Sequence, residues 1–307
     1  MTGEATAARR ARSDELVGGA LLLATSVLFG AVVVLGKVAG RSGLAVPSLL
    51  AFRFAVAAVI LAAALVVLRR PLAAAKGEGR RLFALGVAGY AVESGLFFAA
   101  LPHGTVPAVT LLFFTYPVFV AVLAAATGKG LPGWLLGMAL AAAVAGAAIV
   151  VVAGGRAAID PTGVGFALGS ALMFSLYLLG ADAVLHRTDS LTGAMWVSVA
   201  AAVALASWAL ATGSAQWPRG WHQWGPVLGM AVCTSGAFFC LFAGLRRLGA
   251  VRTAIISTAE PLAAAGLALA FLGDSLHRGT VLGGVLILSA AVAASIARTT
   301  PPEPQGP

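Results

Sequence analysis

The stretch Ser257-Thr258-Ala259-Glu260-Pro261 lies near the middle of an apolar run that extends from Val251 to Leu272. Proline has no N–H to donate and its ring crowds the preceding turn, so a helix through this run is broken or kinked at Pro261. The carbonyl of Ser257, four residues earlier, loses its usual partner. A carboxylate such as Glu260 is costly inside an apolar span and usually serves a function there. The stretch therefore marks a candidate functional site.

The same arrangement occurs 144 residues earlier, where Phe113-Phe114-Thr115-Tyr116-Pro117 again lies midway along an apolar run. Here Pro117 breaks the helix and Phe113 carries the carbonyl that loses its partner. Two proline-interrupted segments in corresponding halves of a chain are the best sequence indication of a transporter's binding site. The two breaks are therefore expected to face one central cavity, and Pro117 and Pro261 are predicted to act as hinges.

The composition is that of a membrane protein. Of the 307 residues, 60% are hydrophobic and only 10% are charged, whereas soluble domains contain about 25% charged residues. Runs of roughly 20 apolar residues recur, each long enough to cross a bilayer as a helix, and they do not alternate as barrel strands do. The net charge of +9 comes from basic residues beside apolar runs, which indicates membrane topology and a lipid bilayer as partner, not nucleic acid.

The apolar runs predict an all-α integral membrane protein with ten transmembrane helices in two five-helix halves. The domains expected are a cytoplasmic, disordered tail over 1–15, a first repeat over 16–155, a second repeat over 160–297, and a cytoplasmic tail over 298–307. The predicted helices are 16–37, 46–68, 82–101, 106–126, 132–153, 163–185, 191–212, 223–244, 250–272 and 279–297.

The two halves resemble each other at offsets near 144 residues, which is the separation between Pro117 and Pro261. Leu28-Phe29-Gly30 matches Met173-Phe174-Ser175, and Phe97-Phe98 falls near Phe238-Phe239. Because each half has five spans, the second half must enter the membrane from the opposite side. The sequence therefore predicts inverted repeats, with a substrate site near the midplane between them.

Basic residues predict the orientation, because cytoplasmic loops of membrane proteins carry an excess of Lys and Arg. With ten spans, both termini share one side with the loops after helices 2, 4, 6 and 8, and most of the 20 Lys and Arg residues lie there. The opposite side has Arg41, Arg156, Arg219 and Arg278, while Lys37 and Arg53 lie inside spans. Both termini are therefore expected in the cytoplasm, and the protein in the cytoplasmic membrane.

The chain resembles the EamA family of the drug/metabolite transporter superfamily over about residues 17–297. The resemblance rests on Phe52-Arg53-Phe54 early in helix 2 and on a proline in the fourth helix of each half. It also rests on a Gly-acid-x-Leu turn after that helix, matched by Gly273-Asp274-Ser275-Leu276, from which Gly128-Lys129-Gly130-Leu131 departs. The resemblance implies secondary transport of small metabolites, often export of amino acids or other polar compounds.

Glu93 and Glu260 are the acidic residues predicted near mid-membrane, and either can carry a coupling proton. For Glu93 the alternative is a buried ion pair with Arg53 or Lys37. For Glu260 the alternative is a structural acid bonded to the backbone exposed at the proline break. Arg53 does not lose its proton, so it would hold a substrate carboxylate, or else play a structural role.

Uncharged side chains complete the predicted substrate and proton site. Tyr116 precedes a mid-helix proline and has a hydroxyl to satisfy, and Tyr90 lies beside Glu93. Some of the aromatic residues of helices 3, 4 and 8 should line a cavity for apolar or aromatic groups, although packing or lipid contact is the alternative for each. The remaining candidates are Phe97, Phe113, Phe239 and Ser257.

These features predict a secondary active transporter of amino acids or similar metabolites that works by alternating access, with export as the expected direction. The alternatives are an intramembrane enzyme, for which we find no His/Asp cluster or HExxH, and a channel-like permease without ion coupling, for which polar residues are sparse. No enzymatic activity, cofactor or metal is expected. Expected partners are a small-molecule substrate and protons, whereas substrate identity, coupling and oligomeric state stay open.

Overall fold

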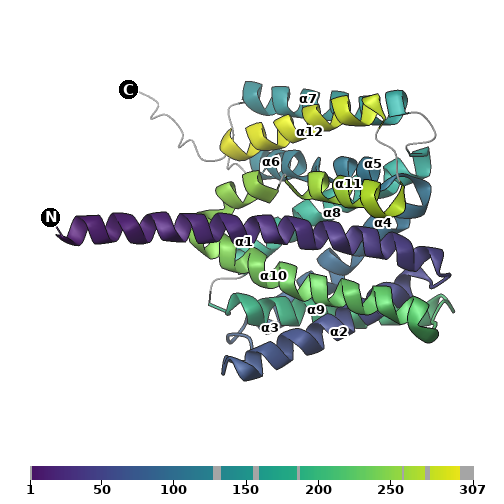
Figure 1. The fold of residues 1–307 in the computed structure, drawn as a ribbon, viewed down its shortest axis with the longest axis horizontal. Helices are drawn as coiled ribbons and strands as arrows, with labels where there is room; N and C mark the ends of the chain where they lie inside the picture. Colours follow the sequence, from purple (N-terminus) through teal and green to yellow (C-terminus); the bar gives the residue numbers. More distant parts are fainter. Residues whose placement is uncertain are drawn as a thin grey trace.

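The computed structural model describes residues 2–126, 133–154, 159–184, 187–257, 259–273 and 277–297, and their regular elements are all helices (Figure 1). Besides these, one isolated bridge pairs Gly104 with Ile159. The helices are α1 (Thr2–Arg41), α2 (Val46–Val67), α3 (Gly79–Ala84), the π-helix η1 (Leu85–Ala91), α4 (Val92–Ala100), the 3-10 helix η2 (Leu101–His103), α5 (Val106–Phe113), α6 (Tyr116–Ala126), α7 (Gly133–Gly154), α8 (Pro161–Val184), α9 (Ser190–Ala211), α10 (Gly220–Ser257), α11 (Ala259–Leu272) and α12 (Arg278–Ala297).

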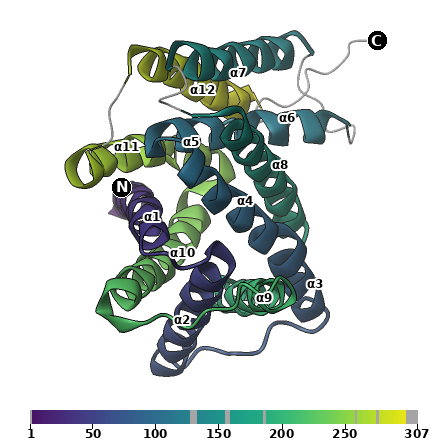
Figure 2. The ribbon, with the colours of Figure 1, turned by 90° about the vertical axis from the view of Figure 1, so that its right-hand side faces the viewer.

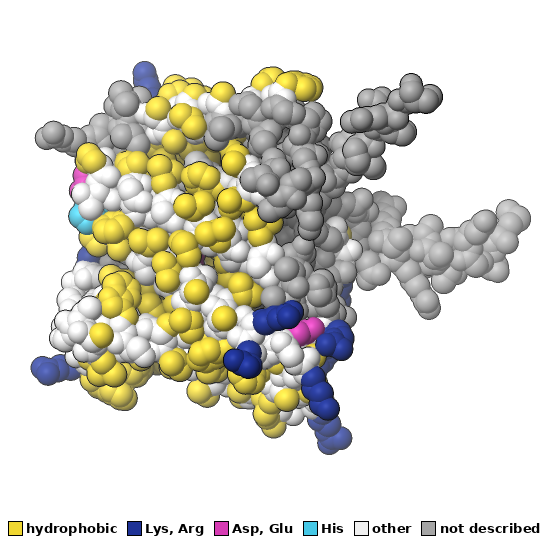
Figure 3. Space-filling model, turned by 180° about the vertical axis from the view of Figure 1, so that it is seen from behind, with side chains coloured by type: hydrophobic (Ala, Val, Ile, Leu, Met, Phe, Trp, Pro, Cys, Tyr) yellow, Lys and Arg dark blue, Asp and Glu magenta, His cyan; other side chains and the backbone are white. Residues whose placement is uncertain are grey.

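The all-helical membrane fold is confirmed in the described part of the chain. Six helices there are long and apolar enough to cross a membrane, and four shorter apolar helices accompany them. The six cover 16–41, 46–67, 79–103, 161–181, 190–211 and 220–241, and the shorter ones cover 106–120, 141–150, 259–272 and 278–290. Hydrophobic side chains spread over the middle of the surface, with Lys and Arg gathered toward its ends (Figure 3). A total of ten spans stays a prediction.

Two sequence predictions about helix ends are wrong. Residues 2–15 are not a disordered tail but the start of α1, which projects beyond the other helices (Figure 1). The predicted loop at 245–249 is instead part of the continuous helix α10. Residues 2–15 are rich in Ala and Arg and residues 245–249 in Leu and Arg, all of which are strong helix formers, and neither segment contains a proline. Helix propensity therefore outweighs the polar residues that were taken to mark a chain end and a loop.

The two halves meet in an arrangement that fits an inverted repeat. Lys37, near the end of α1, donates a hydrogen bond to the carbonyl of Gly104 at 3.0 Å, and Gly104 pairs with Ile159 just before α8. Since α8 begins where α1 ends, the two equivalent helices run in opposite directions. Helix α1 packs against α10 and α11, and α8 packs likewise against α4, α5 and α6 (Figure 2).

Helices α7 and α12, the last of each half, lie side by side at one edge of the bundle (Figures 1 and 2). Gly146 and Gly283 allow this contact, because a Cβ on either would collide with the backbone of the other helix. Small residues permit such close approach between membrane helices. This pair contributes none of the predicted site residues.

At the end of the molecule opposite Gly104, the loop after α2 is joined to the segment before α9. The carboxylate of Glu78, 8% exposed, accepts hydrogen bonds from the N–H groups of Arg187 at 3.2 Å and Thr188 at 2.9 Å, and from the Thr188 hydroxyl. Arg70 pairs with Asp189 at 2.6 Å. Bonding by the Thr188 hydroxyl, and then by the two N–H groups, lowers the pKa of Glu78.

We predict that Glu78→Gln lowers the thermal midpoint at pH 7 by about 2–4 °C, because it removes the charged acceptor from this junction. The contribution of a carboxylate whose pKa is lowered by folding is complete above its unfolded pKa and disappears as the pH falls through the folded pKa. The difference from wild type should therefore shrink below about pH 4.5. Lys76→Gln is the control, since Lys76 contributes only a backbone carbonyl to the junction. A pH-independent difference in a melting series from pH 7 to 3.5 would contradict the prediction.

Candidate functional site

The first proline lies at a helix interruption, as the sequence predicts, because α5 ends at Phe113 and α6 begins at Tyr116. Pro261 lies in the first turn of α11, and the position between α10 and α11 falls outside the described residues, so the break there stays a prediction. In the first break the Thr115 hydroxyl donates to the carbonyl of Leu112 at 2.8 Å. Backbone polar groups exposed at such a break need protein or water partners because lipid offers none.

Equivalent positions of α1 and α8 lie against the two proline-containing helices. Gly30 of α1 faces the backbone of α11, where a Cβ would come within 2.9 Å of the Ala264 nitrogen. Its counterpart Ser175 in α8 is fully buried, and its hydroxyl lies 2.9 Å from the carbonyl of Tyr116 and 2.7 Å from that of Ala171. Each half therefore places the same position of its first helix against the proline-containing helix of the other half.

Aromatic rings form a continuous cluster between the halves, with contacts from α2 to α10. Phe174 packs on Phe113 and Tyr116, with ring centroids 5.3 and 4.8 Å apart, and it stacks on Tyr177 at 6.0 Å. Tyr177 in turn lies 5.2 Å from Tyr90. The aromatic cluster comprises Phe29, Phe54, Tyr90, Phe97, Phe98, Phe113, Phe114, Tyr116, Phe174, Tyr177 and Phe238.

Sequence reasoning identified only part of this cluster. The predicted residue Phe239 is 49% exposed and, among described ring contacts, has none, whereas its buried neighbour Phe238 packs on Tyr90 at 5.5 Å. Tyr177 was not predicted, nor was Phe174 as a site residue. The match of Phe174 with Phe29 between the halves was the available signal for it, because equivalent residues of inverted repeats approach one central region.

Arg53 is buried beside this cluster, with only 2% of its surface exposed. Its Nε donates to the hydroxyl of Thr234 at 2.8 Å, and its guanidinium lies 4.6 Å from the ring centre of Phe54 and 5.3 Å from that of Phe98. The guanidinium also interacts electrostatically with Glu93, but the described salt bridges do not include this pair. At these distances both rings attract the cation electrostatically.

Glu93 is 6% exposed and lies just after the π-helix η1. One carboxylate oxygen accepts a hydrogen bond from Ser94 at 3.0 Å and the other from Ser170 of α8 at 3.2 Å. Ser170 also lies 3.1 Å from the carbonyl of Glu93. An isolated π-helix frequently marks a functional site, and no feature of the sequence indicated this one.

The second acid lies on the other side of the cluster. Glu260, in the first turn of α11, is partly buried, as is Ser257. The charge of Glu260 acts on the hydroxyl of Tyr116 and on Glu93. The structure therefore brings Arg53, Glu93 and Glu260 into one electrostatically connected region with Tyr90 and Tyr116, formed by both halves.

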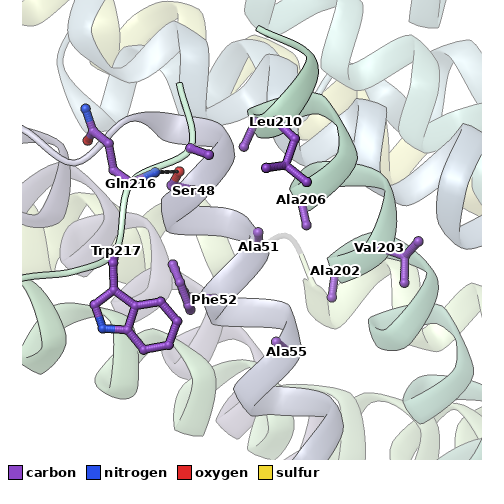
Figure 4. Close-up of a pocket in the computed structure, with 12 residues that line it drawn as sticks. Ser48, Ala51, Phe52, Ala55, Ala202, Val203, Ala206, Leu210, Gln216 and Trp217 are labelled. Atoms are coloured by element: carbon purple, nitrogen blue, oxygen red, sulfur yellow. Dashed lines mark hydrogen bonds between the residues drawn. The ribbon is translucent and has the colours of Figure 1, made fainter. Parts of the chain in front are cut away.

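A separate groove of about 480 Å³ lies between α2 and α9 (Figure 4). Alanines line much of it, and its polar rim is already bonded within the protein, since Ser48 donates to the Ser214 carbonyl at 3.0 Å and accepts from the Gln216 N–H at 2.9 Å. No predicted site residue lines this groove. The described residues also contain no group of three or more His, Cys, Asp or Glu side chains that could hold a metal ion.

An all-helical membrane protein with a proline-interrupted helix and charged side chains between two related halves has the architecture of a transporter. The EamA-like transporter family matches residues 16–152 and 161–296, so the chain belongs to this family. Among solved structures, one described only as "Crystal structure of protein" has a TM-score of 0.62 and 20% identity, covering 92% of this chain and 98% of its own. This likeness supports the fold. Curated proteins give no significant match.

Proposed function

We propose that this protein is a proton-coupled secondary transporter that moves small carboxylate-bearing metabolites, such as amino acids, by alternating access. The observation that supports the proposal most directly is the helix break at Pro117 beside the buried charged groups Arg53 and Glu93, with Pro261 and Glu260 in the equivalent helix of the other half. Breaks of this kind concentrate exposed backbone groups at a midplane site. Membership of a transporter family makes a catalytic role a poor alternative.

The chemistry of the buried groups defines the expected substrate. The guanidinium of Arg53 suits a carboxylate, which it can hold with two parallel hydrogen bonds. The rings of Tyr90, Tyr116 and Phe113 offer contacts for an apolar or aromatic side chain. Glu93 and Glu260 supply exchangeable protons within the same region, so substrate and proton can influence each other's binding.

The test is flux measured in liposomes that contain the purified protein. A panel of amino acids with aromatic, aliphatic and charged side chains is offered with and without a pH gradient. We expect saturable uptake of at least one apolar or aromatic amino acid, accelerated by the gradient. Amines that lack the carboxylate serve as matched controls. Absence of saturable flux across the panel, or equal flux of acids and amines, would refute the proposal.

The orientation is proposed to place both termini in the cytoplasm and the segment around Gln216 outside, with export as the direction. A cysteine at exposed Gln216 should react with an impermeant thiol reagent on intact cells, in a background that lacks Cys233 and Cys240. A cysteine at exposed Lys76, near the opposite end, should react only after the cells are opened. The reverse pattern would invert the proposed topology.

A further inference from the structure

The hydroxyl of Ser170 lies within hydrogen-bond distance of two oxygens of one residue in the other half. These are the carbonyl of Glu93 at 3.1 Å and its carboxylate oxygen Oε1 at 3.2 Å. Ser170 is fully buried. The second carboxylate oxygen, Oε2, accepts from Ser94 at 3.0 Å. One carboxylate oxygen is therefore held from within α4, and the other is held from α8.

A hydroxyl group has a single hydrogen, so Ser170 cannot make a full bond to both oxygens at once. A charged acceptor forms the stronger bond, so the carboxylate takes the hydrogen while Glu93 is ionised. When a proton binds the carboxylate, this advantage is lost and the backbone carbonyl becomes the competitive acceptor. The step forms one O–H bond on Glu93 and breaks no covalent bond within the protein.

We propose that Ser170 is a positioning residue that transmits the protonation state of Glu93 to helix α8 and hence to the contact between the two halves. This inference rests on the proposed proton-coupled transport. Ionised Glu93 holds α8 through the Ser170 hydroxyl, and protonated Glu93 releases that hold. Proton binding thereby changes the attachment of α8 at the place where the halves must move against each other.

Other charged or titratable groups also face Glu93, but they act through space. They are Arg53 from α2, Tyr90 from η1, Tyr177 from α8 and Glu260 from α11. Among the described hydrogen bonds to this carboxylate, only that of Ser170 comes from another helix. The hydroxyl is therefore the direct mechanical link between the acid and the second half.

Helix α8 has a second attachment one and a half turns further on. The hydroxyl of Ser175, also fully buried, lies 2.9 Å from the carbonyl of Tyr116 beside the first proline break and 2.7 Å from that of Ala171 in its own helix, so its one hydrogen is shared between two backbone acceptors. This contact involves no ionisable group. Loss of the Ser170 bond alone would leave α8 anchored at the break, so that α8 can turn about this point relative to α4.

The first test follows the protonation of Glu93 itself. Infrared difference spectra of the protein in lipid vesicles, recorded as a pH titration, contain the carbonyl stretch of the protonated acid, and Glu93→Gln identifies the band by removing it. In Ser170→Ala the protonated acid should persist to higher pH by about one unit, a tenfold change in proton affinity, because a donor to the ionised form is gone. Ser175→Ala is the matched control and should not move the midpoint.

The second test measures transport by the same variants. Ser170→Ala should weaken the coupling of flux to the pH gradient by about fivefold, the low end of ordinary coupling energies, and retain substrate exchange. In the Glu93→Gln background it should have no additional effect on coupling. An unchanged infrared midpoint in Ser170→Ala, or an equal shift in Ser175→Ala, would overturn the inference. A shifted midpoint in a protein without flux would instead reject the proposed transport and keep the Ser170–Glu93 contact.

Discussion

Glu93→Gln is expected to abolish pH-driven net flux in liposomes, while exchange of substrate for substrate continues at a reduced rate. Glutamine keeps the shape of the side chain, and its amide oxygen can accept the hydrogen bond of one of the two serines, Ser94 or Ser170, while its NH2 group faces the other hydroxyl as a donor. It cannot bind and release a proton. During exchange the transporter carries substrate in both directions and needs no net proton movement. A variant that retains exchange but lacks pH-driven flux has therefore lost coupling and not substrate binding.

Glu260→Gln distinguishes the contributions of the two acids. Its carboxylate is only partly buried and interacts with Glu93 through space, so we expect a smaller loss of pH-driven flux than in Glu93→Gln. Glu78→Gln is the matched control, because Glu78 lies outside the spans in the junction before α9. Full pH-driven flux in both single variants and in the double variant would exclude these carboxylates as the coupling site.

The positions of most helices follow from the sequence because long apolar runs have few ways to satisfy their backbone in a membrane. The predicted helices over 132–153 and 191–212 agree within one residue at each end with α7 and α9. The exceptions are the start of α1 and the middle of α10, where polar residues continue a helix beyond the apolar run. Hydropathy detects the bilayer segment, but helix ends depend on propensity and capping.

The helix break at Pro117 could also be predicted, since it depends on one residue type with a local steric effect. The π-helix η1 could not, because no residue in Leu85–Ala91 has a comparable local requirement. Ser170 and Tyr177 were missed for another reason. Their roles depend on which helix of the other half lies opposite, and in a run rich in Gly, Ala and Ser a buried serine resembles ordinary packing.

The alternative interpretation of Glu93, an ion pair with Arg53, shows the same limit. The sequence placed both residues within neighbouring spans, and the structure does bring them into electrostatic contact. The described salt bridges nevertheless do not include a bond between Arg53 and Glu93. The guanidinium is contacted by Thr234 and two phenylalanine rings, and the carboxylate is bonded by two serines. Side chains from the second half therefore decide whether these charges form a structural pair or remain available to ligands.

Pro261→Ala and Pro117→Ala are expected to slow the conformational step more than they change substrate affinity. Each restores an N–H that can bond the carbonyl four residues earlier. The interruption between α5 and α6 should therefore close toward a continuous helix, and the kink that the sequence predicts at Pro261 should straighten. We expect turnover to fall about tenfold, equivalent to about 1.4 kcal/mol on the barrier. The effect should be smaller at Pro117, because the Thr115 hydroxyl still bonds the carbonyl of Leu112.

The control for both variants is Pro226→Ala. Pro226 lies inside α10, whose helix continues through it without interruption, so its replacement also changes a proline within a helix but closes no break. Binding and turnover should be measured separately, on variants that express and melt like the wild type. Wild-type turnover in both Pro117→Ala and Pro261→Ala would show that the breaks only shape static packing. An equal loss in Pro226→Ala would show that the slowing does not depend on the breaks, and only a loss confined to Pro117 and Pro261 supports hinge motion at the site between the two halves.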